Sequence, residues 1–284
     1  MDLEKQQEEI SSIYQVVILG AEEILSITGN QSWSQNMLLK SDDFLQNKKY
    51  QKVLLDSLQF FTPEEEIDNI ISNLENLFAP LAESADAESG EMQVLFCRRG
   101  SKDNPIKIYF EICKAPYRIP FEIHLIAYPG HKIFPQKKTA IHKRSEESFT
   151  YNMFPPEEYL ALAFYEVIKD LELIVDMSWY KQIYETLCKE SADGRKVWES
   201  LNRLIKEYPI PSLEKRLDTL AGYKDYGYMR KRWKSQSRRR RESYPRWEDV
   251  VSLMVKFLTP IFEGILKDEI FLGDWMPELG RYLD

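Results

Sequence analysis

Apolar side chains recur every three or four residues in two stretches of the first 90 residues, the spacing of an amphipathic helix. The first stretch contains Ile10, Ile13, Tyr14, Val17 and Ile18, and the second contains Ile67, Ile70, Ile71, Leu74, Leu77 and Phe78. The second follows Thr62-Pro63-Glu64-Glu65, which supplies a capping hydroxyl, a proline and two acidic side chains. We therefore predict a helical N-terminal region whose second helix is capped by Thr62.

The apolar period changes to two in residues 91–150. Ile106, Ile108, Phe110 and Ile112 alternate with polar side chains, and so do Phe121, Ile123 and Leu125. This alternation is typical of strands with one buried face. It predicts an antiparallel strand pair over residues 106–126, with Glu111 and Glu122 on its polar face. Residues 129–150 contain proline, glycine and many lysines, which predicts a long loop.

Helical spacing returns in residues 151–284. Pro155-Pro156-Glu157-Glu158 is predicted to open a helix, and others are expected at residues 178–190, 193–207, 212–235 and 246–267. Helices, then strands, then helices is the order of an α+β fold. We expect a helical N-terminal region, a small antiparallel or mixed sheet and a helical C-terminal region. The predicted domains are residues 1–150 and 151–284.

Charged side chains make up 30% of the chain, and the net charge is −8. No run approaches the roughly 18 consecutive apolar residues of a membrane helix. The first residues are acidic, unlike those of a secretory signal, so we expect a cytoplasmic protein without a membrane partner. Cys97, Cys113 and Cys188 are too widely spaced for a disulfide framework or a zinc ribbon, and are assigned to packing.

Eight of the twelve residues 230–241 are basic. They are Arg230, Lys231, Arg232, Lys234, Arg238, Arg239, Arg240 and Arg241. Phosphates relieve the mutual repulsion of such a cluster, and arginine binds them bidentately. Trp233, Tyr226 and Tyr228 could stack on unpaired bases. The cluster predicts binding of RNA or DNA. The alternative is a solvated helix face neutralised by residues 1–90, whose 17 acidic and 5 basic residues give a net charge of −12.

The polar face of the strand pair offers a second candidate site. Glu111 and Glu122 lie on neighbouring predicted strands, and carboxylate oxygens are the ligands that Mg²⁺ prefers. The alternative is the ordinary solvent face of an antiparallel sheet. Gly100-Ser101-Lys102-Asp103 could present backbone N–H groups to a phosphate, although such a turn is common. His131 and His142 are interpreted as surface residues of the predicted loop.

Three stretches of the second half resemble the AbiEii/AbiGii abortive-infection toxin family of nucleotidyltransferase-like proteins. The first is Pro156-Glu157-Glu158-Tyr159-Leu160-Ala161-Leu162-Ala163 with Leu171-Glu172-Leu173-Ile174-Val175-Asp176-Met177. The second is Pro245-Arg246-Trp247-Glu248-Asp249-Val250-Val251 with Phe257-Leu258-Thr259-Pro260, and the third is Gly273-Asp274-Trp275-Met276-Pro277. These stretches carry helical scaffold rather than catalytic residues.

The resemblance implies a small mixed sheet flanked by helices and transfer of a nucleotide to RNA, often tRNA, with Mg²⁺ and a nucleoside triphosphate. It also implies a place in a toxin–antitoxin or phage-defence system. The family's glycine turn has a weak counterpart in Ile18-Leu19-Gly20-Ala21-Glu22, and its Asp-x-Asp pair a poor one in Lys40-Ser41-Asp42-Asp43-Phe44. Glu122 could replace the third carboxylate.

Three interpretations stay open on the sequence. The first is a nucleotidyltransferase-like protein that acts on RNA or binds it. The second is a nonenzymatic nucleic-acid-binding or assembly subunit that uses residues 230–241. The third is a protein–protein adaptor whose acidic N-terminal helices dock on a basic partner.

Overall fold

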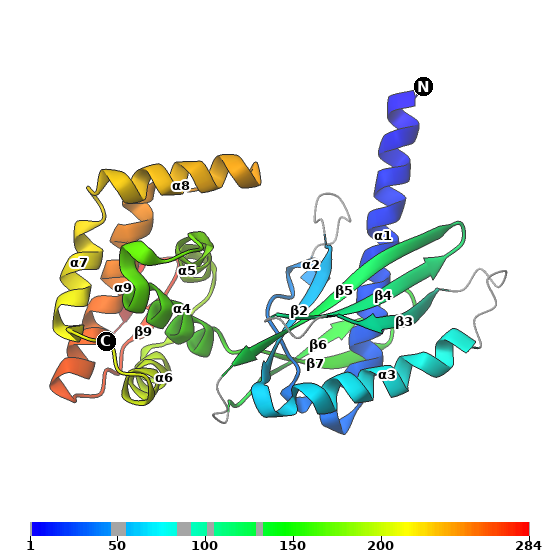
Figure 1. Cartoon of the computed structure of the whole chain (residues 1–284), viewed down its shortest axis with the longest axis horizontal. Helices are drawn as coiled ribbons and strands as arrows, with labels where there is room; N and C mark the ends of the chain where they lie inside the picture. Colours follow the sequence, from blue (N-terminus) through cyan, green and yellow to red (C-terminus); the bar gives the residue numbers. More distant parts are fainter. Residues whose placement is uncertain (1, 47–54, 84–91, 101–104, 129–132, 284) are drawn as a thin grey trace. The chain divides into compact units, whose positions relative to one another are not determined.

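The fold is α+β, as the sequence predicts (Figure 1). The computed structural model describes residues 2–46, 55–83, 92–100, 105–128 and 133–283. The chain forms two compact units, Met1–Phe154 and Pro155–Asp284. This division falls four residues after the boundary expected from the sequence. Each unit buries its own set of apolar side chains.

The first unit is built on a seven-stranded mixed sheet with strand order β3-β4-β5-β2-β1-β7-β6. Its strands are β1 (Leu38–Leu39), β2 (Ser57–Pro63), β3 (Gln93–Arg99), β4 (Ile106–Lys114), β5 (Tyr117–Tyr128), β6 (Gln136–Ile141) and β7 (Ser148–Met153). Its helices are α1 (Asp2–Gly29), η1 (Ser32–Asn36), α2 (Asp43–Gln46), η2 (Glu64–Glu66) and α3 (Ile67–Glu83). The pairs β2–β5 and β1–β7 are parallel, and the other pairs are antiparallel.

The predicted strand pair is confirmed. Strands β4 and β5 run antiparallel, and Tyr109 lies opposite Glu122. Because side chains alternate along a strand, Ile108, Phe110 and Ile112 share the buried face of β4, and Glu111 lies on the other. Strand β4 therefore has one apolar face, toward the helices, and one more polar face.

Two local predictions are wrong. Residues 136–153 form the antiparallel hairpin β6–β7 rather than part of a long loop, with Thr139 opposite Thr150. Thr62 is not a helix cap, because it lies in β2 with its side chain buried and its hydroxyl unpartnered among the described residues. Helix α3 begins after the 3-10 turn η2, which consists of the three acidic residues Glu64–Glu66.

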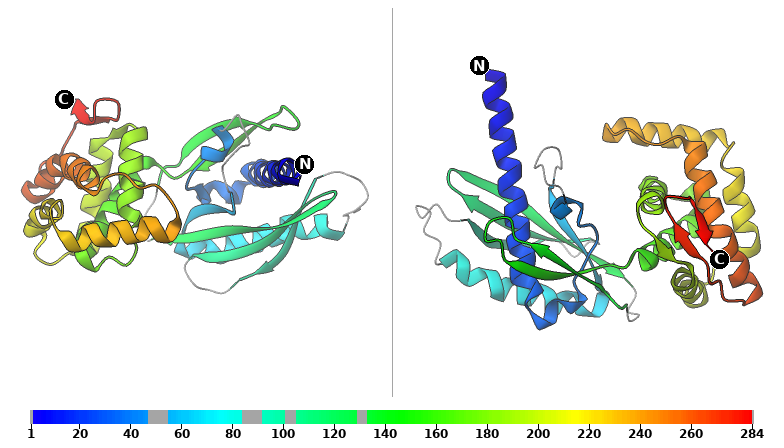
Figure 2. Two further views of the ribbon diagram at one scale, coloured as in Figure 1. Left: turned by 90° about the horizontal axis from the view of Figure 1, so that it is seen from above. Right: turned by 180° about the vertical axis from the view of Figure 1, so that it is seen from behind.

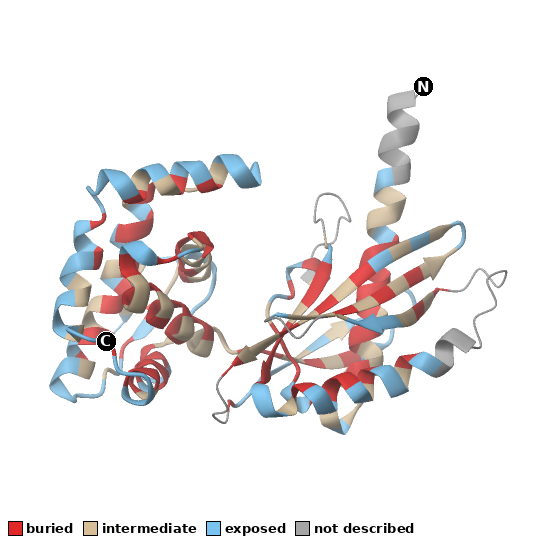
Figure 3. Cartoon of the chain, viewed as in Figure 1, coloured by how far each residue is buried: buried red, intermediate tan, exposed pale blue. Residues whose placement is uncertain are grey.

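Helix α1 crosses the apolar face of the sheet (Figure 2). It is buried on nearly all sides between residues 16 and 25, where it contacts the strands (Figure 3). A side chain at Gly20 would place its Cβ 2.5 Å from Cδ1 of Ile112, so the helix can approach β4 only because this residue lacks one. The Ile18 to Glu22 segment is thus helical packing surface, and its interpretation as a glycine turn is wrong.

Ile10–Gly29 is also long and apolar enough to cross a membrane by length and composition. Half of that segment is buried inside the first unit.

The second unit is mainly helical. Its helices are α4 (Pro156–Asp170), η3 (Leu171–Leu173), α5 (Ser178–Lys189), α6 (Gly194–Glu207), η4 (Leu213–Lys215), α7 (Arg216–Gly222), α8 (Gly227–Arg240) and α9 (Trp247–Lys267). A small antiparallel sheet of β8 (Ala192–Asp193), β9 (Asp274–Met276) and β10 (Arg281–Leu283) completes the unit. Trp275 anchors that sheet, because its buried indole N–H donates to the carbonyl of Leu187 at 2.8 Å.

The single helix predicted over residues 212–235 is wrong. The chain forms α7 and α8 there, separated by a turn at Tyr223–Tyr226. Gly222 and Gly227 flank the turn, and glycine is a poor helix former. The break gives α8 a direction of its own, so the basic run lies on a separate helix.

Replacement of Gly20 by alanine tests how α1 packs on the sheet. We expect the free energy of unfolding to fall by about 1–3 kcal/mol, because the new Cβ collides with the fully buried Ile112 side chain. Ile112→Ala alone is also destabilising, since it leaves a cavity. In urea denaturation, the double variant is expected to lose less stability than the sum of the two single variants. Additive losses would show that Gly20 and Ile112 do not meet.

Candidate nucleic-acid interface

Helix α8 carries seven of the eight basic residues of the 230–241 run, and the eighth, Arg241, is its C-cap in the left-handed conformation. Met229, Trp233 and Gln236 are buried at spacings of four and three residues. This spacing fixes which side of the helix faces the core. The cations are consequently divided between two sides of α8.

One side of α8 is anchored to the segment that precedes α5. The guanidinium of Arg232 donates to the carbonyls of Glu172, at 2.7 Å, of Ile174 and of Val175, at 3.3 Å. Arg240 lies 3.4 Å from the Asp176 carboxylate, which also accepts from the amide of Gln236 at 2.8 Å. Arg232 therefore holds the fold together rather than facing a ligand.

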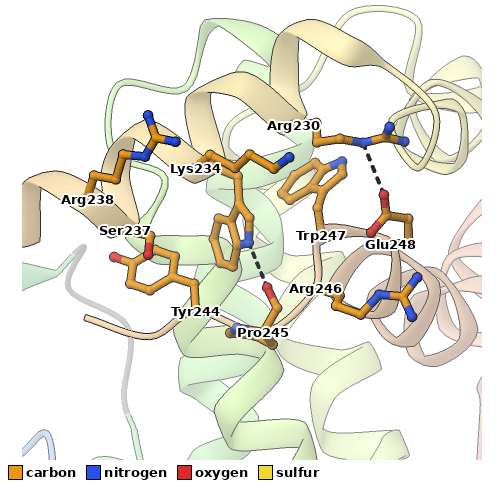
Figure 4. Close-up of a pocket in the computed structure, with 10 residues that line it drawn as sticks. Arg230, Lys234, Ser237, Arg238, Tyr244, Pro245, Arg246, Trp247 and Glu248 are labelled. Carbon is orange, nitrogen blue, oxygen red and sulfur yellow. Dashed lines mark hydrogen bonds and ion pairs between the residues drawn. The ribbon is translucent and has the colours of Figure 1, made fainter. Parts of the chain in front are cut away.

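The other side of α8 lines a pocket of 510 Å³ (Figure 4). Its cations are Arg230, Lys234 and Arg238, which are spaced four residues apart on α8, and Arg246, which precedes α9. Arg230 Nε lies 3.0 Å from Glu248 Oε1. Neither Lys234 nor Arg238, both exposed, forms an ion pair with a residue that the structure describes. The pocket thus has a net positive charge.

Aromatic rings form the floor of this pocket. The Trp233 ring lies 4.6 Å from that of Tyr244 and 5.4 Å from that of Trp247, between ring centroids. The Trp233 indole N–H donates to the carbonyl of Pro245 at 2.9 Å, which ties α8 to the segment before α9. Since Trp233 is only 3% exposed, its predicted role in stacking on a base is not supported. Its buried ring instead packs against Tyr244 and Trp247 in the floor of the pocket.

The remaining residues of the predicted interface are accessible. Lys231, Arg239 and Arg241 are exposed, although Arg239 also donates to the side-chain oxygen of Gln236 at 2.9 Å. Tyr226 and Tyr228 are 45% and 51% exposed, with ring centroids 5.9 Å apart. These two tyrosines, rather than Trp233, offer faces on which an unpaired base could stack.

The two strand carboxylates have separate partners in the structure. Glu122 Oε2 lies 3.0 Å from the Lys107 ammonium and 2.5 Å from His124 Nε2. Glu111 lies 3.4 Å from Arg118 and accepts from the Cys113 thiol at 3.5 Å. The hydrogen bond from His124, followed by that from Lys107, holds the pKa of Glu122 below its usual range. Both carboxylates therefore already have internal partners, cationic in each case.

These contacts fit a Mg²⁺ site poorly. A metal ion at Glu122 would lie beside the Lys107 ammonium, which repels it. Within the described residues, no three histidine, cysteine, aspartate or glutamate side chains form a group that could hold a metal. Asp42 is buried against Tyr151 and Lys138, whereas Asp43 is exposed and accepts from Ser41. The two acids of that stretch thus do not share a site.

Sequence reasoning missed a buried polar network in the first unit. Glu22 is 0% exposed and lies 2.7 Å from the Lys143 ammonium, and the neighbouring Glu23 lies 3.1 Å from His142 Nε2. His142 Nδ1 accepts from the backbone N–H groups of Arg144 and Ser145. The interpretation of His142 as a surface residue is wrong. Acidic side chains at consecutive positions inside the apolar α1 pattern were the available signal.

Other predictions fall outside the functional surfaces. Cys97 and Cys188 are exposed and Cys113 is partly buried, so their assignment to packing is wrong for the first two. Of the proposed phosphate turn, residues 101–103 lie outside the described part of the chain, as does His131.

No protein-family profile matches the chain, and no curated protein sequence matches it. Two solved structures from Helicobacter pylori are similar to it, each with a TM-score of 0.38. One is the protein JHP933, at 8% identity over 89% of this chain and 94% of that one. The other, described as a "putative nucleotidyltransferase", has 11% identity over 90% of this chain and 99% of that one. At this level of likeness, the chemistry has to be argued from the residues themselves.

Replacement of Arg232 by lysine tests whether this residue anchors α8. The two terminal nitrogens of Arg232 reach different carbonyls, and the single nitrogen of a lysine cannot match this fork, so we expect the free energy of unfolding to fall by about 1–3 kcal/mol. Arg238→Lys, on the pocket side, is the matched control and is expected to change it by less than about 0.5 kcal/mol. Urea denaturation measures both. Equal effects would contradict the division of the cations.

The pKa of Glu122 can be followed by carbon NMR. We expect it to titrate below an ordinary glutamate and to move back toward the ordinary value in His124→Ala, which removes the largest cause of the shift. A lowered pKa stabilises the fold above the unfolded-state pKa, and this stabilisation is lost as the pH falls through the folded-state value. An unchanged titration in His124→Ala would show that the contact is not formed in solution.

Proposed function

We propose that this protein binds single-stranded nucleic acid through the pocket between α8 and the start of α9. The observation that carries this proposal is the division of the cations on α8. Arg232 is used by the fold, whereas Lys234 and Arg238 are exposed and unpaired among the described residues. Arginine and lysine on one helix face can follow a phosphate backbone, whose charge supplies most of the affinity.

The neighbouring aromatic residues favour an unpaired strand. Tyr226 and Tyr228 lie just before Arg230 in the sequence and expose about half of their surface. Aromatic stacking on successive bases is how proteins hold single strands with little sequence preference. Backbone contacts position a nucleic acid without reading its bases, so RNA and DNA with the same sequence are both candidate ligands.

Nucleotide transfer to RNA, with Mg²⁺ and a nucleoside triphosphate, is the competing interpretation. It follows from the sequence resemblance, and the contacts of Glu111 and Glu122 do not favour it. Incubation with labelled triphosphates, Mg²⁺ and total tRNA tests it. Transfer of label that disappears in Glu122→Ala would replace the binding proposal with the enzymatic one. A place in toxin–antitoxin or phage-defence biology and an adaptor role stay predictions.

Replacement of both Lys234 and Arg238 by glutamine tests the interface. We expect binding of a single-stranded oligonucleotide to weaken about tenfold or more, since two phosphate contacts are lost. The slope of the logarithm of affinity against the logarithm of salt concentration is expected to fall by about 1.4, or about 0.7 for each contact. Fluorescence anisotropy over a salt series measures both quantities.

The matched control is Lys196→Gln with Arg281→Gln, which removes the same charges from exposed positions elsewhere in the second unit. It is expected to keep the salt slope of the unaltered protein. A thermal melt of both variants excludes a loss of fold. Equal weakening by the two double variants would mean that net charge alone, rather than this pocket, governs binding.

A further inference from the structure

The row of cations in the pocket ends at a carboxylate. Arg238, Lys234 and Arg230 lie in succession along α8, and Glu248, at the start of α9, lies beside the Arg230 guanidinium (Figure 4). The Glu248 side chain is 28% exposed, and its contact with Arg230 is 3.0 Å. Its own backbone N–H, and then the nearby cations Arg230, Arg246 and Lys234, lower the pKa of this carboxyl. A negative charge therefore closes one end of an otherwise positive surface.

This arrangement distinguishes the end of a strand from its middle. A strand that passes through the pocket must continue in both directions, and in one of them its next phosphodiester would meet Glu248. Like charges at contact distance repel. A strand that ends in the pocket needs only one exit, on the side of Arg238. The position of the carboxylate thus favours a chain end.

The charge and the size of the pocket agree with such an occupant. A phosphate monoester carries a charge of about −1.5 to −2 at neutral pH, whereas each phosphodiester within a strand carries −1. The cations that line the pocket, from α8 and from the segment before α9, gain more from the monoester. The volume of 510 Å³ lies in the range of small-molecule sites, which suits one nucleotide better than a duplex.

We propose that the pocket binds the terminal phosphate monoester of a single-stranded nucleic acid, with Lys234 and Arg238 on the phosphate. Glu248 acts as the stop that sets the position of the end. This inference rests on the proposed function and adds the part of the ligand that is recognised. The chemistry is common to 5′ and 3′ phosphates, so the experiment includes both.

Binding of three oligonucleotides with one sequence and an internal fluorophore tests the proposal. One carries a 5′ phosphate, one a 3′ phosphate, and one hydroxyls at both ends. We expect one of the phosphorylated strands to bind about fivefold to tenfold more tightly than the hydroxyl strand. The preference is expected to shrink between pH 7 and pH 5, because the monoester takes up a proton with a pKa near 6.

Glu248→Gln provides the second readout. Without the carboxylate, the hydroxyl strand is expected to bind more tightly and the preference for the phosphorylated end to fall toward one. The Lys196→Gln and Arg281→Gln control is expected to keep the preference, and a thermal melt checks that each variant is folded.

The two proposals fail in different ways. Equal binding of all three strands, weakened equally by Lys234→Gln, would overturn the recognition of an end and leave single-strand binding intact. Binding that is absent, or that is insensitive to Lys234→Gln and Arg238→Gln, would overturn both. A preference that persists unchanged in Glu248→Gln would remove the stop from the proposal.

Discussion

The contact between the Arg232 guanidinium and the carbonyls of residues 172, 174 and 175 determines the surface of the second unit. These carbonyls follow Leu171, which has a positive φ of 50°, a conformation that costs a non-glycine residue about 1–3 kcal/mol. A segment with this backbone needs donors from elsewhere in the fold, and α8 provides them. This contact of Arg232 fixes the rotation of α8 about its axis, so Lys234 and Arg238 face the pocket.

The charges of the first unit show the opposite arrangement. Glu22, Asp42 and Glu122 each lie within 3.1 Å of a lysine ammonium. A carboxylate that already holds a cation has little to offer a metal ion, because a second cation would be repelled by the first. These three acidic groups thus join parts of the first unit to one another. In the basic pocket, by contrast, Lys234 and Arg238 form no ion pair with a described residue.

The sequence predicted the elements that repeat a simple pattern. Strands β4 and β5 alternate between apolar and polar side chains over most of their length, and α3 carries an apolar face of regular spacing. The hairpin β6–β7 was not predicted because Gln136, Lys137 and Ile141 of β6 are all exposed. Strand β6 therefore has no alternation of apolar and polar side chains. Exposed strands of this kind are held by backbone hydrogen bonds, which composition does not report.

The sequence indicates where the candidate interface lies, but it does not indicate which of its cations face the pocket. Eight cations in twelve residues mark the helix, yet their division depends on which side of α8 is buried. Gln236 is part of that buried side, and a polar residue gives no hydrophobic signal. The partners of Arg232 are backbone carbonyls about 60 residues away, which no local pattern can indicate. Pro245 and Arg246 join the pocket only through the tertiary fold.

The ion pair between Glu22, which is fully buried, and Lys143, whose side chain is 20% exposed, has a consequence for how these two positions vary. Loss of Lys143 leaves the Glu22 carboxylate as an uncompensated charge in a low-dielectric interior, which typically costs about 3–5 kcal/mol, whereas an apolar pair of similar volume is often tolerated. A single substitution of this kind is therefore strongly destabilising, whereas a joint substitution of both residues is not. Among descendants of this chain, positions 22 and 143 are expected to drift as a correlated pair, although 120 residues separate them.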